Sequence, residues 1–387
     1  MKKVVLQPGR EKSVLQYHPW IFSGAVLSLP EYTPGDLLPV TSASGKHLGY
    51  GYFNPKSQII GRMVCFDQTE PHEAIRKHII RAIALRNELM DPKTTARRLI
   101  NAEGDLLPGL IVDQYDHVLV VQIATLGMER LKDFVVQVLS QELNPSWIVE
   151  VSTSASRKQE GLGPVKQTLY GSAREQVVVQ EGDLKFAVAP LSGQKTGFFL
   201  DLREMRYLIQ SIAKGKKVLN CCSYTGAFTC HALLGGATKV VSVDISKDAI
   251  EQTKRHVELN GFDASRHEAY VSDVFEFIEK NALDFDIVIV DPPAFAKQKK
   301  DVPNAVKAYR ELNRQVIAKM RPQSFLLTCS CSYHVDDPLF RKLIFQASSS
   351  AKRAVQILGG HRLAFDHPVN MYHPEGSYLK SYFLRID

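Results

Sequence analysis

The strongest constraint on the fold is the order of apolar stretches after about Leu184, where short strand-like runs alternate with helical segments. Runs of this kind occupy residues 217–220, 240–243 and 325–328. Strands that alternate with helices form a parallel sheet, because each right-handed crossover returns the chain to the same end of the sheet. The sequence therefore predicts an α/β domain over residues 184–387, built on a doubly wound, mostly parallel sheet.

The first 68 residues follow a different pattern, in which short strand-like stretches are separated by turns such as Pro34-Gly35. Residues 47–53 alternate within one of these stretches, as expected for a strand with one buried face. Closely spaced turns between short strands are typical of small all-β domains. We therefore expect a small β-barrel at residues 1–68.

Residues 69–183 predict an α+β middle domain that opens with an amphipathic helix. The apolar face of this helix carries Ile75, Ile79, Ile83 and Leu89. A hairpin at residues 110–121, a helix at 128–139 and a strand at 147–151 are expected to follow. Four cations of the first helix are expected on its surface, namely Arg76, Lys77, Arg81 and Arg86.

Composition narrows the class of protein. The 387 residues carry a formal net charge of +7 and a pI near 8.9, which favours a polyanionic partner such as RNA or DNA. The six cysteines lack the paired spacing of a zinc site, so we expect reduced thiols and no metal. Gln7 to Arg10 interrupt the apolar run that a signal peptide needs, and no later run approaches membrane-spanning length. We therefore expect a cytoplasmic protein without a membrane partner.

The turn after the first strand of the predicted parallel sheet indicates a ligand site. Gly226 lies in that turn, where a glycine lets the backbone approach a ligand closely at a helix N-terminus. The next strand ends in Asp244, at the distance expected for a carboxylate that accepts hydrogen bonds from both hydroxyls of an adenosine ribose. A dinucleotide fold would need three glycines in the turn to admit a pyrophosphate. The single glycine therefore favours S-adenosylmethionine over NAD.

Two further strand ends support the same cofactor. Asp273 follows the third strand and can accept a hydrogen bond from the adenine amino group. Asp291 follows the fourth strand and is held by Pro292 and Pro293, which restrict the backbone. Because ligands of such sheets bind at the carboxyl ends of the strands, Asp291 should face the place where methyl group and target base meet. The pattern predicts a methyltransferase.

Two thiols follow the next strand, at Cys329 and Cys331. Buried cysteine commonly packs as a small apolar residue, which is one interpretation of both. A cysteine and a carboxylate that flank one ligand are, however, what methylation of a pyrimidine at carbon 5 requires. We take Cys331 as the nucleophile, since it lies further from the apolar part of the strand, and Cys329 as the alternative.

Motifs along nearly the whole chain resemble the ribosomal RNA large subunit methyltransferase I family, which makes 5-methylcytidine in 23S ribosomal RNA. The stretches that carry the resemblance are residues 9–13, 18–25, 107–113, 157–161, 195–201, the loop at 223–226, Asp291-Pro292-Pro293 and Ser330-Cys331-Ser332. The resemblance implies an N-terminal PUA domain at 1–68, a middle domain at 69–183 and a class I S-adenosylmethionine-dependent methyltransferase domain at 184–387. It also implies that residues 195–201 close over the cofactor.

These motifs indicate which residues take part in catalysis, cofactor binding and RNA binding. Cys331 and Asp291 are the predicted catalytic residues. The predicted cofactor site consists of Thr196, Phe198, Asn220, Ser223, Tyr224, Thr225, Gly226, Asp244, Ile245, Asp273, Val274 and Asp291. The cations expected to bind ribosomal RNA are Arg10, Lys12, Arg157 and Lys158. Residues 151–154 depart from the family, whose members tend to carry an Arg and an Asp there.

In the predicted mechanism, Cys331 adds as a thiolate to carbon 6 of cytosine and makes carbon 5 nucleophilic. Ala294 stands where related RNA methyltransferases with two cysteines place the second one, so another base must remove the carbon 5 proton. Two other functions stay open: methylation of a guanosine in ribosomal RNA, and a non-catalytic ribosome-assembly factor that binds RNA. Whether the protein forms a homodimer is also left open.

Overall fold

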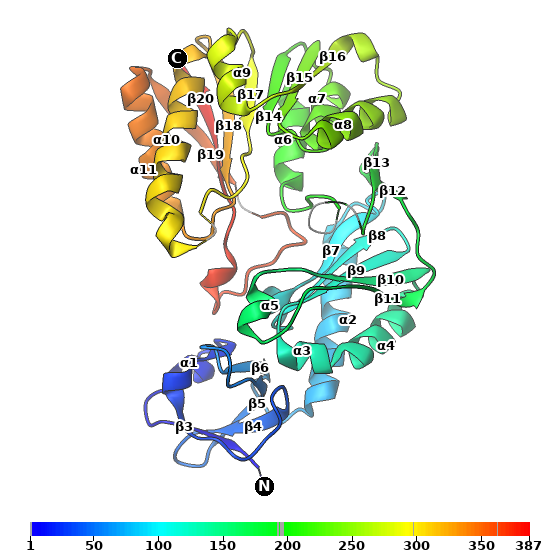
Figure 1. Ribbon diagram of the computed structural model, residues 1–387, viewed down its shortest axis with the longest axis vertical. Helices are drawn as coiled ribbons and strands as arrows, with labels where there is room; N and C mark the ends of the chain where they lie inside the picture. Colours follow the sequence, from blue (N-terminus) through cyan, green and yellow to red (C-terminus); the bar gives the residue numbers. More distant parts are fainter. Residues whose placement is uncertain (1, 192, 194–196, 297, 362) are drawn as a thin grey trace. The chain divides into compact units, whose positions relative to one another are not determined.

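The computed structural model describes residues 2–387 except residues 192, 194–196, 297 and 362, and the chain divides into two compact units (Figure 1). The first unit comprises Met1–Gly182, Ala187–Leu200 and Phe365–Gly376. The second comprises Asp183–Phe186, Asp201–Ala364 and Ser377–Asp387. Each unit therefore contains segments that are far apart in the sequence. Over the described residues, no helix combines the length and apolar character needed to cross a membrane.

The N-terminal part of the first unit is a six-stranded sheet in the order β2-β6-β5-β4-β1-β3 (Figure 1). Its strands are β1 (Val4–Leu6), β2 (Trp20–Ile21), β3 (Val26–Ser28), β4 (Leu37–Thr41), β5 (His47–Phe53) and β6 (Gly61–Cys65), with a short helix α1 (Lys12–Leu15) and a 3-10 turn η1 (Ser23–Ala25). β1 pairs parallel with β4, and the other strand pairs are antiparallel. Val4, Val40, Phe53 and Met63 form part of its buried core. The predicted small all-β domain is confirmed.

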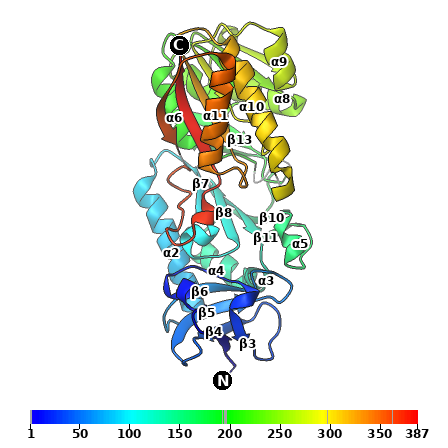
Figure 2. The same cartoon turned by 90° about the vertical axis from the view of Figure 1, so that its left-hand side faces the viewer.

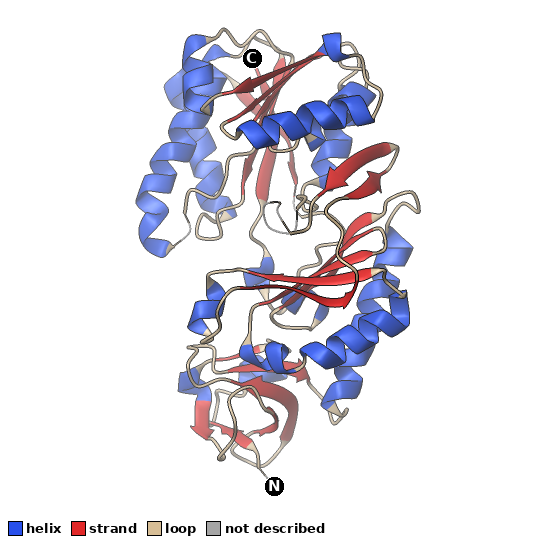
Figure 3. Ribbon diagram, turned by 45° about the vertical axis from the view of Figure 1, so that its right-hand side comes forward, coloured by secondary structure: helices blue, strands red, loops and turns tan. Residues whose placement is uncertain are grey.

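The middle part of the first unit is a five-stranded sheet in the order β11-β10-β9-β8-β7, flanked by helices (Figure 3). The strands are β7 (Ala96–Asn101), β8 (Leu110–Tyr115), β9 (Val118–Ile123), β10 (Trp147–Ser152) and β11 (Val165–Gly171). The helices are α2 (Pro71–Leu89), α3 (Leu126–Arg130), α4 (Lys132–Leu143) and α5 (Ser156–Gln159), with the 3-10 turn η2 (Ala102–Asp105). The expected hairpin at residues 110–121 is formed by β8 and β9.

Two details of these helices differ from the sequence prediction. The helix expected at 128–139 is two helices, α3 and α4, because the amide of Leu131 is shared between the carbonyls of Gly127 (3.2 Å) and Met128 (3.1 Å), which tightens the chain there. Leu89, expected on the buried face of α2, is 49% exposed because α2 ends at this residue. Ile75, Ile79 and Ile83 are buried as expected.

Arg86 was expected on the surface of α2, and that expectation is wrong. Its side chain is buried, and its guanidinium donates to both carboxylate oxygens of Asp105 at 2.6 and 2.8 Å. It also donates to the carbonyls of Arg98 (2.9 Å) and Asp366 (2.8 Å), both in the same unit. A planar guanidinium with five donors can satisfy several acceptors at once, which is why arginine fits this buried position.

A two-stranded sheet joins β12 (Val177–Glu181) to β13 (Leu184–Val188), and the boundary between the two units falls within this hairpin. The second unit is built on a seven-stranded sheet in the order β16-β15-β14-β17-β18-β20-β19. Its strands are β14 (Lys217–Cys221), β15 (Lys239–Asp244), β16 (His267–Val271), β17 (Ile287–Val290), β18 (Ser324–Ser330), β19 (Val355–His361) and β20 (Lys380–Ile386). The first five are parallel, and β20 runs antiparallel to both β18 and β19.

Helices cover both faces of this sheet (Figures 1 and 2). The helices α6 (Arg203–Ile212), α7 (Ala227–Leu234) and α8 (Lys247–Leu259) pack in succession against one another, and so do α9 (Val274–Lys280), α10 (Val302–Lys319) and α11 (Asp337–Ala351). Short 3-10 turns are η3 (Ala264–Arg266) and η4 (Lys299–Asp301), and η5 (Pro374–Gly376) belongs to the first unit. The predicted doubly wound, mostly parallel α/β domain is confirmed.

The buried Arg86–Asp105 pair generates a stability prediction. Arg86→Met should lower the free energy of unfolding by about 3–5 kcal/mol, because it leaves the Asp105 carboxylate buried without its cation. The matched control is Arg314→Met, whose pair with Glu311 joins side chains that are 38% and 44% exposed, and whose loss should cost about 0–1 kcal/mol. Chemical denaturation followed by circular dichroism measures both. Equal effects of the two substitutions would contradict the importance assigned to the buried pair.

Candidate active site

The parallel register of the second unit brings the expected site residues to one end of its sheet. Cys221 at the end of β14 lies opposite Val290, the residue before Asp291. Asp244 at the end of β15 lies opposite Val271, two residues before Asp273. Val290 in turn lies opposite Thr328 on the strand that leads to Cys331. The carboxyl ends of five strands, β14 to β18, therefore lie at one end of the sheet.

The turn between β14 and α7 is unusually bent. Cys222 (φ 57°), Tyr224 (φ 47°) and Gly226 (φ 78°) all have positive φ, a conformation that side chains other than hydrogen disfavour. A Cβ on Gly226 would lie 2.4 Å from the side chain of Thr253 on α8. Glycine is therefore required here, because a side chain would clash with the neighbouring helix.

Asp244 organises this turn. Its carboxylate accepts hydrogen bonds from the backbone amides of Tyr224 (2.8 Å, to Oδ2) and Ser246 (2.9 Å, to Oδ1). Each oxygen of a carboxylate has two acceptor positions, so each keeps one that these amides do not use. The two remaining positions match the two hydroxyls of a ribose, which makes the arrangement suitable for an adenosine.

Other predicted cofactor residues differ in what they offer. The hydroxyl of Ser223 is buried and has no hydrogen-bond partner among the described residues, as expected for a group that meets a ligand. Ile245 is 73% exposed beside Asp244 and offers an apolar surface. Asn220 instead donates from Nδ2 to Thr229 (3.0 Å) inside the unit. The carbonyl of Thr225 hydrogen-bonds to the ring of His256 at 2.7 Å.

The structure shows Asp273 in a capping role. Its Oδ1 accepts from the amides of Phe275 (2.8 Å) and Glu276 (3.2 Å), so it caps the N-terminus of α9. Val274, the first residue of this helix, is buried against the core. Because the capping bonds involve only one oxygen, the other remains to accept a hydrogen bond from an amino group.

The two thiols at the end of the fifth parallel strand have different surroundings. Cys329 lies within β18 and is fully buried, and burial raises the pKa of its thiol well above the ordinary value, with the charge of Asp291 raising it further. Cys331 lies just past the strand and is partly exposed. Its Sγ is 3.8 Å from the carbonyl oxygen of Pro292. Cys331 therefore lies against the Asp-Pro-Pro turn, and its thiol is the more accessible.

The sequence analysis assigned no role to three residues around Cys331. The hydroxyl of Tyr309 on α10 and that of Ser332 are 2.9 Å apart, and Ser332 is fully buried. The ammonium of Lys380, the first residue of β20, donates to the carbonyl oxygen of Ser332 at 2.7 Å. A lysine two residues before the apolar run 382–384 was the one available signal, because its side chain would be carried into the sheet.

Of the predicted closing segment, residues 197–200 are counted with the first unit and Asp201 with the second. Phe198 is counted with the first unit, where it is buried and its carbonyl accepts from the hydroxyl of Tyr115 at 3.3 Å. Thr196, and Lys195 at the start of the segment expected to close over the cofactor, lie outside the described residues.

Of the four cations predicted to bind RNA, three are exposed: Arg10, Lys12 and Lys158. Arg157 is only 2% exposed, and its side chain is bonded to other residues of the first unit. Its guanidinium donates to the carbonyl of Gly163 (2.7 Å) and pairs with Glu129 (3.1 Å). A cation with these partners is poorly placed to bind a phosphate.

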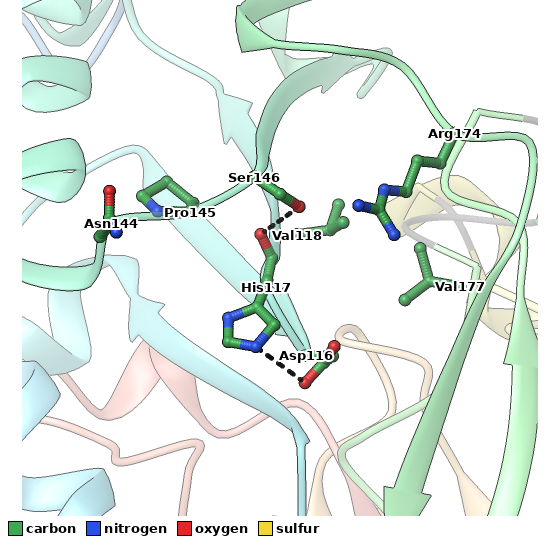
Figure 4. Close-up of a pocket in the computed structure, with 8 residues that line it drawn as sticks. All are labelled: Asp116, His117, Val118, Asn144, Pro145, Ser146, Arg174 and Val177. Atoms are coloured by element: carbon green, nitrogen blue, oxygen red, sulfur yellow. Dashed lines mark hydrogen bonds and ion pairs between the residues drawn. The ribbon is translucent and has the colours of Figure 1, made fainter.

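A hollow of about 340 Å³ in the first unit involves none of the predicted site residues (Figure 4). It is lined by Asp116, His117, Val118, Asn144, Pro145, Ser146, Arg174 and Val177. The hydroxyl of Ser146 donates to the carbonyl of His117 at 3.1 Å, and Arg174 reaches toward the hollow from the opposite side (Figure 4). Across the part of the chain that the structure describes, no cluster of three or more His, Cys, Asp or Glu side chains could hold a metal ion.

Comparison with known proteins bears on this geometry. A family model described as S-adenosylmethionine-dependent methyltransferase matches residues 98–354, and a PUA-like domain model matches residues 4–66. The ribosomal RNA large subunit methyltransferase I of Alteromonas mediterranea is 40% identical over 386 residues, which cover 98% of this chain and 97% of the relative. The protein of the same name from Vibrio cholerae El Tor is 38% identical and covers 99% of both chains.

This chain belongs to the ribosomal RNA large subunit methyltransferase I family. Members of this family use S-adenosylmethionine, and the predicted cofactor is thereby confirmed. A solved structure of a protein from Streptococcus mutans, assigned as a SAM-dependent methyltransferase, superposes with a TM-score of 0.84 at 25% identity over 99% of this chain and all of that chain. Another methyltransferase, solved in complex with SAH, gives a TM-score of 0.86 at 26% identity with the same coverage.

The proposed contact between Asp244 and the cofactor can be tested by its effect on S-adenosylmethionine affinity. Asp244→Ala should weaken S-adenosylmethionine binding at least about tenfold, since it removes charge-assisted hydrogen bonds worth roughly 1.5–3 kcal/mol each and loosens the turn at Tyr224. The matched control is Asp263→Ala, whose carboxylate also caps a backbone amide, that of Ser265 at 2.9 Å. Calorimetric titration measures both affinities. Unchanged affinity in Asp244→Ala would contradict the assignment.

Proposed function

We propose that this enzyme methylates carbon 5 of a cytosine in 23S ribosomal RNA. The names of its relatives support ribosomal RNA of the large subunit as the substrate. The observation that carries the choice of cytosine carbon 5 is the 3.8 Å contact between the Cys331 thiol and the Pro292 carbonyl. This contact supports an arrangement in which the Cys331 nucleophile and the Asp291 carboxylate lie on two sides of one base.

In this proposal the chain's own residues perform the ring chemistry. Cys331 as thiolate forms a bond to carbon 6, which makes carbon 5 electron-rich. S-adenosylmethionine, when bound, supplies a methyl group activated by its sulfonium. Asp291, sharing a proton with cytosine N3, stabilises the charge that develops on the ring during addition. A base then takes the carbon 5 proton, the bond between sulfur and carbon 6 breaks, and the thiolate is restored.

The cofactor is best placed along the carboxyl ends of β14, β15 and β16. Asp244 would hold the ribose through its two unused acceptor positions, and Asp273 would accept from the adenine amino group. The buried hydroxyl of Ser223 and the exposed side chain of Ile245 support a ligand between them. Thr196 and Phe198 remain proposed contributors to the same site through the family resemblance alone.

We further propose that the division into an RNA-binding barrel at 1–68, a middle domain at 69–183 and a catalytic domain at 184–387 reflects a division of roles. Arg10 and Lys12 are exposed on the barrel, and Lys158 is exposed on the middle domain. Exposed cations that neutralise phosphates bind RNA with little dependence on its sequence. These residues would position the RNA while the second unit carries out the reaction.

The thiol assignment is testable with single substitutions. Cys331→Ala should abolish methyl transfer while cofactor affinity is preserved, and Cys329→Ala, the matched control two residues away, should keep most activity. With 5-fluorocytidine in the target RNA, the wild type should accumulate a covalent RNA adduct, because fluorine cannot leave as a proton does. Gel electrophoresis under denaturing conditions detects the adduct, and nucleoside mass spectrometry identifies the methylated base.

Two outcomes would overturn this part of the proposal. An adduct that persists in Cys331→Ala but disappears in Cys329→Ala would show that Cys329, and not Cys331, is the nucleophile. Full activity in the double variant would exclude an adduct at cytosine carbon 6 and favour methylation of another base, such as guanosine. No methylation of ribosomal RNA by the wild type would favour a binding factor instead.

The RNA-binding role is better tested by point substitution than by deleting the barrel. The hydroxyl of Tyr52 on β5 donates to the carbonyl of Pro108 at 2.8 Å, so removal of the barrel would uncover the middle of its own unit. Arg10→Ala with Lys12→Ala should weaken RNA binding and reduce the slope of log affinity against log salt by about 2, because two phosphate contacts are lost. Lys280→Ala, an exposed lysine of α9, is the control. An unchanged slope in the double variant would exclude these contacts.

A further inference from the structure

Lys380 is a buried lysine whose position next to Cys331 is set by strand pairing. It lies directly opposite Ser330 in the antiparallel pair of β20 and β18. Its ammonium donates to the carbonyl oxygens of Ser332 (2.7 Å) and Tyr378 (2.8 Å), and the residue is 5% exposed. The ammonium is thus held by the carbonyl of Ser332, the residue that follows Cys331.

A buried ammonium normally has a carboxylate partner, because burial without one is costly. Lys132 in the first unit follows this rule, with Glu150 at 2.8 Å. Lys380 does not follow this rule. Among the described residues, no carboxylate oxygen lies within 4 Å of its ammonium nitrogen, the distance that defines an ion pair. Apart from the two carbonyl oxygens that accept from it, the group that balances its charge is therefore either not a carboxylate or lies beyond ion-pair distance.

The charged and titratable groups that interact with Lys380 are Cys331, Asp336 and Asp337. The two carboxylates are engaged elsewhere. Asp336 Oδ1 accepts from the amide of Leu339 at 2.9 Å and caps the N-terminus of α11. Asp337 Oδ1 accepts from the hydroxyl of Tyr382 at 2.9 Å. Cys331 is the remaining group. Its charge also acts on Tyr309 and Cys329, and Asp291 precedes the Pro292 whose carbonyl it contacts.

The electrostatic coupling is consistent with this geometry. Burial lowers the pKa of the Lys380 ammonium to about 8, and a charge on Cys331 opposes that change. Interaction between two sites is mutual, so an ammonium that a thiolate stabilises also stabilises that thiolate. An ordinary thiol, with a pKa of about 8.5, would be ionised only to a few per cent at neutral pH. The nucleophile of the proposed reaction needs such assistance.

We propose that the ammonium of Lys380 is the counter-charge that stabilises Cys331 as a thiolate before it adds to cytosine. The inference rests on the proposed function, in which Cys331 is the nucleophile. Lys380 acts through Cys331 and is a positioning residue. The thiol proton leaves to solvent when the pair ionises, the negative charge is consumed when sulfur bonds to carbon 6, and it returns when that bond breaks.

The stabilisation has a defined pH range. Lys380 is positively charged below its pKa of about 8 and supports the thiolate there. As the pH rises through about 8, the ammonium loses its proton and the support fades. The effect should therefore be largest near neutral pH, where an unassisted thiol is mostly protonated.

The test is the pH dependence of alkylation of Cys331 by iodoacetamide in the full-length protein without RNA. Tandem mass spectrometry distinguishes Cys331 from Cys329. In Lys380→Met the profile should move up by about one pH unit, and alkylation at pH 7 should slow about tenfold. Lys380→Arg keeps the charge and should stay near the wild-type profile. The control is Lys319→Met, a lysine that also donates to backbone carbonyls, among them that of Ile278 at 2.6 Å.

A second measurement covers the case in which Lys380→Met does not fold. NMR titration of lysines labelled with ¹³C at Cε, with the Lys380 signal assigned through Lys380→Arg, should show that Cys331→Ala lowers the pKa of Lys380. An unchanged Lys380 titration in Cys331→Ala, or an unchanged Cys331 profile in a folded Lys380→Met, would overturn the inference. Neither measurement depends on methylation. If Lys380→Met shifts the alkylation profile of Cys331 but the wild type does not methylate cytosine, the interaction between Lys380 and Cys331 stands and the proposed function is rejected.

Discussion

Two backbone amides at the ends of different strands converge on the carboxylate of Asp244. One belongs to Tyr224, in the bent turn after β14, and the other to Ser246, whose side chain caps α8. A turn with three positive φ angles in five residues is costly on its own, so it depends on such fixed hydrogen bonds. The proposed ribose site therefore exists because the same carboxylate that would meet the ligand also holds the loop around it.

Two chemically identical thiols in the same region differ in their burial. Within β18, Cys329 is enclosed by the sheet and its neutral form is favoured. One residue past the strand, Cys331 keeps partial exposure and contacts the turn that carries Asp291. A displacement of two residues along one strand thus changes a packed side chain into one that a substrate can reach.

The sequence predicted those features that depend on local patterns. Strands followed by Gly226, Asp244, Asp273 and Asp291 were predictable because parallel strands place their carboxyl ends together. Arg86 and Lys380 were not, since their burial depends on partners such as Asp105 and Ser332 that no local pattern indicates. The same holds for Arg157, which belongs to a basic motif but pairs with Glu129 inside the fold. A charge pattern alone does not distinguish a cation that binds a ligand from one that completes a core.

The order of the last strands has a consequence for synthesis. β20 follows β19 in the chain but lies between β18 and β19 in the sheet. While the chain emerges from the ribosome, β18 has no neighbour on that side until residues 380–386 are available. An unpaired strand rich in apolar residues can pair with other chains, so the nascent protein passes through a stage in which self-association competes with folding. Insertion of the final strand ends that exposure and, in the same step, delivers Lys380 to its place beside Cys331.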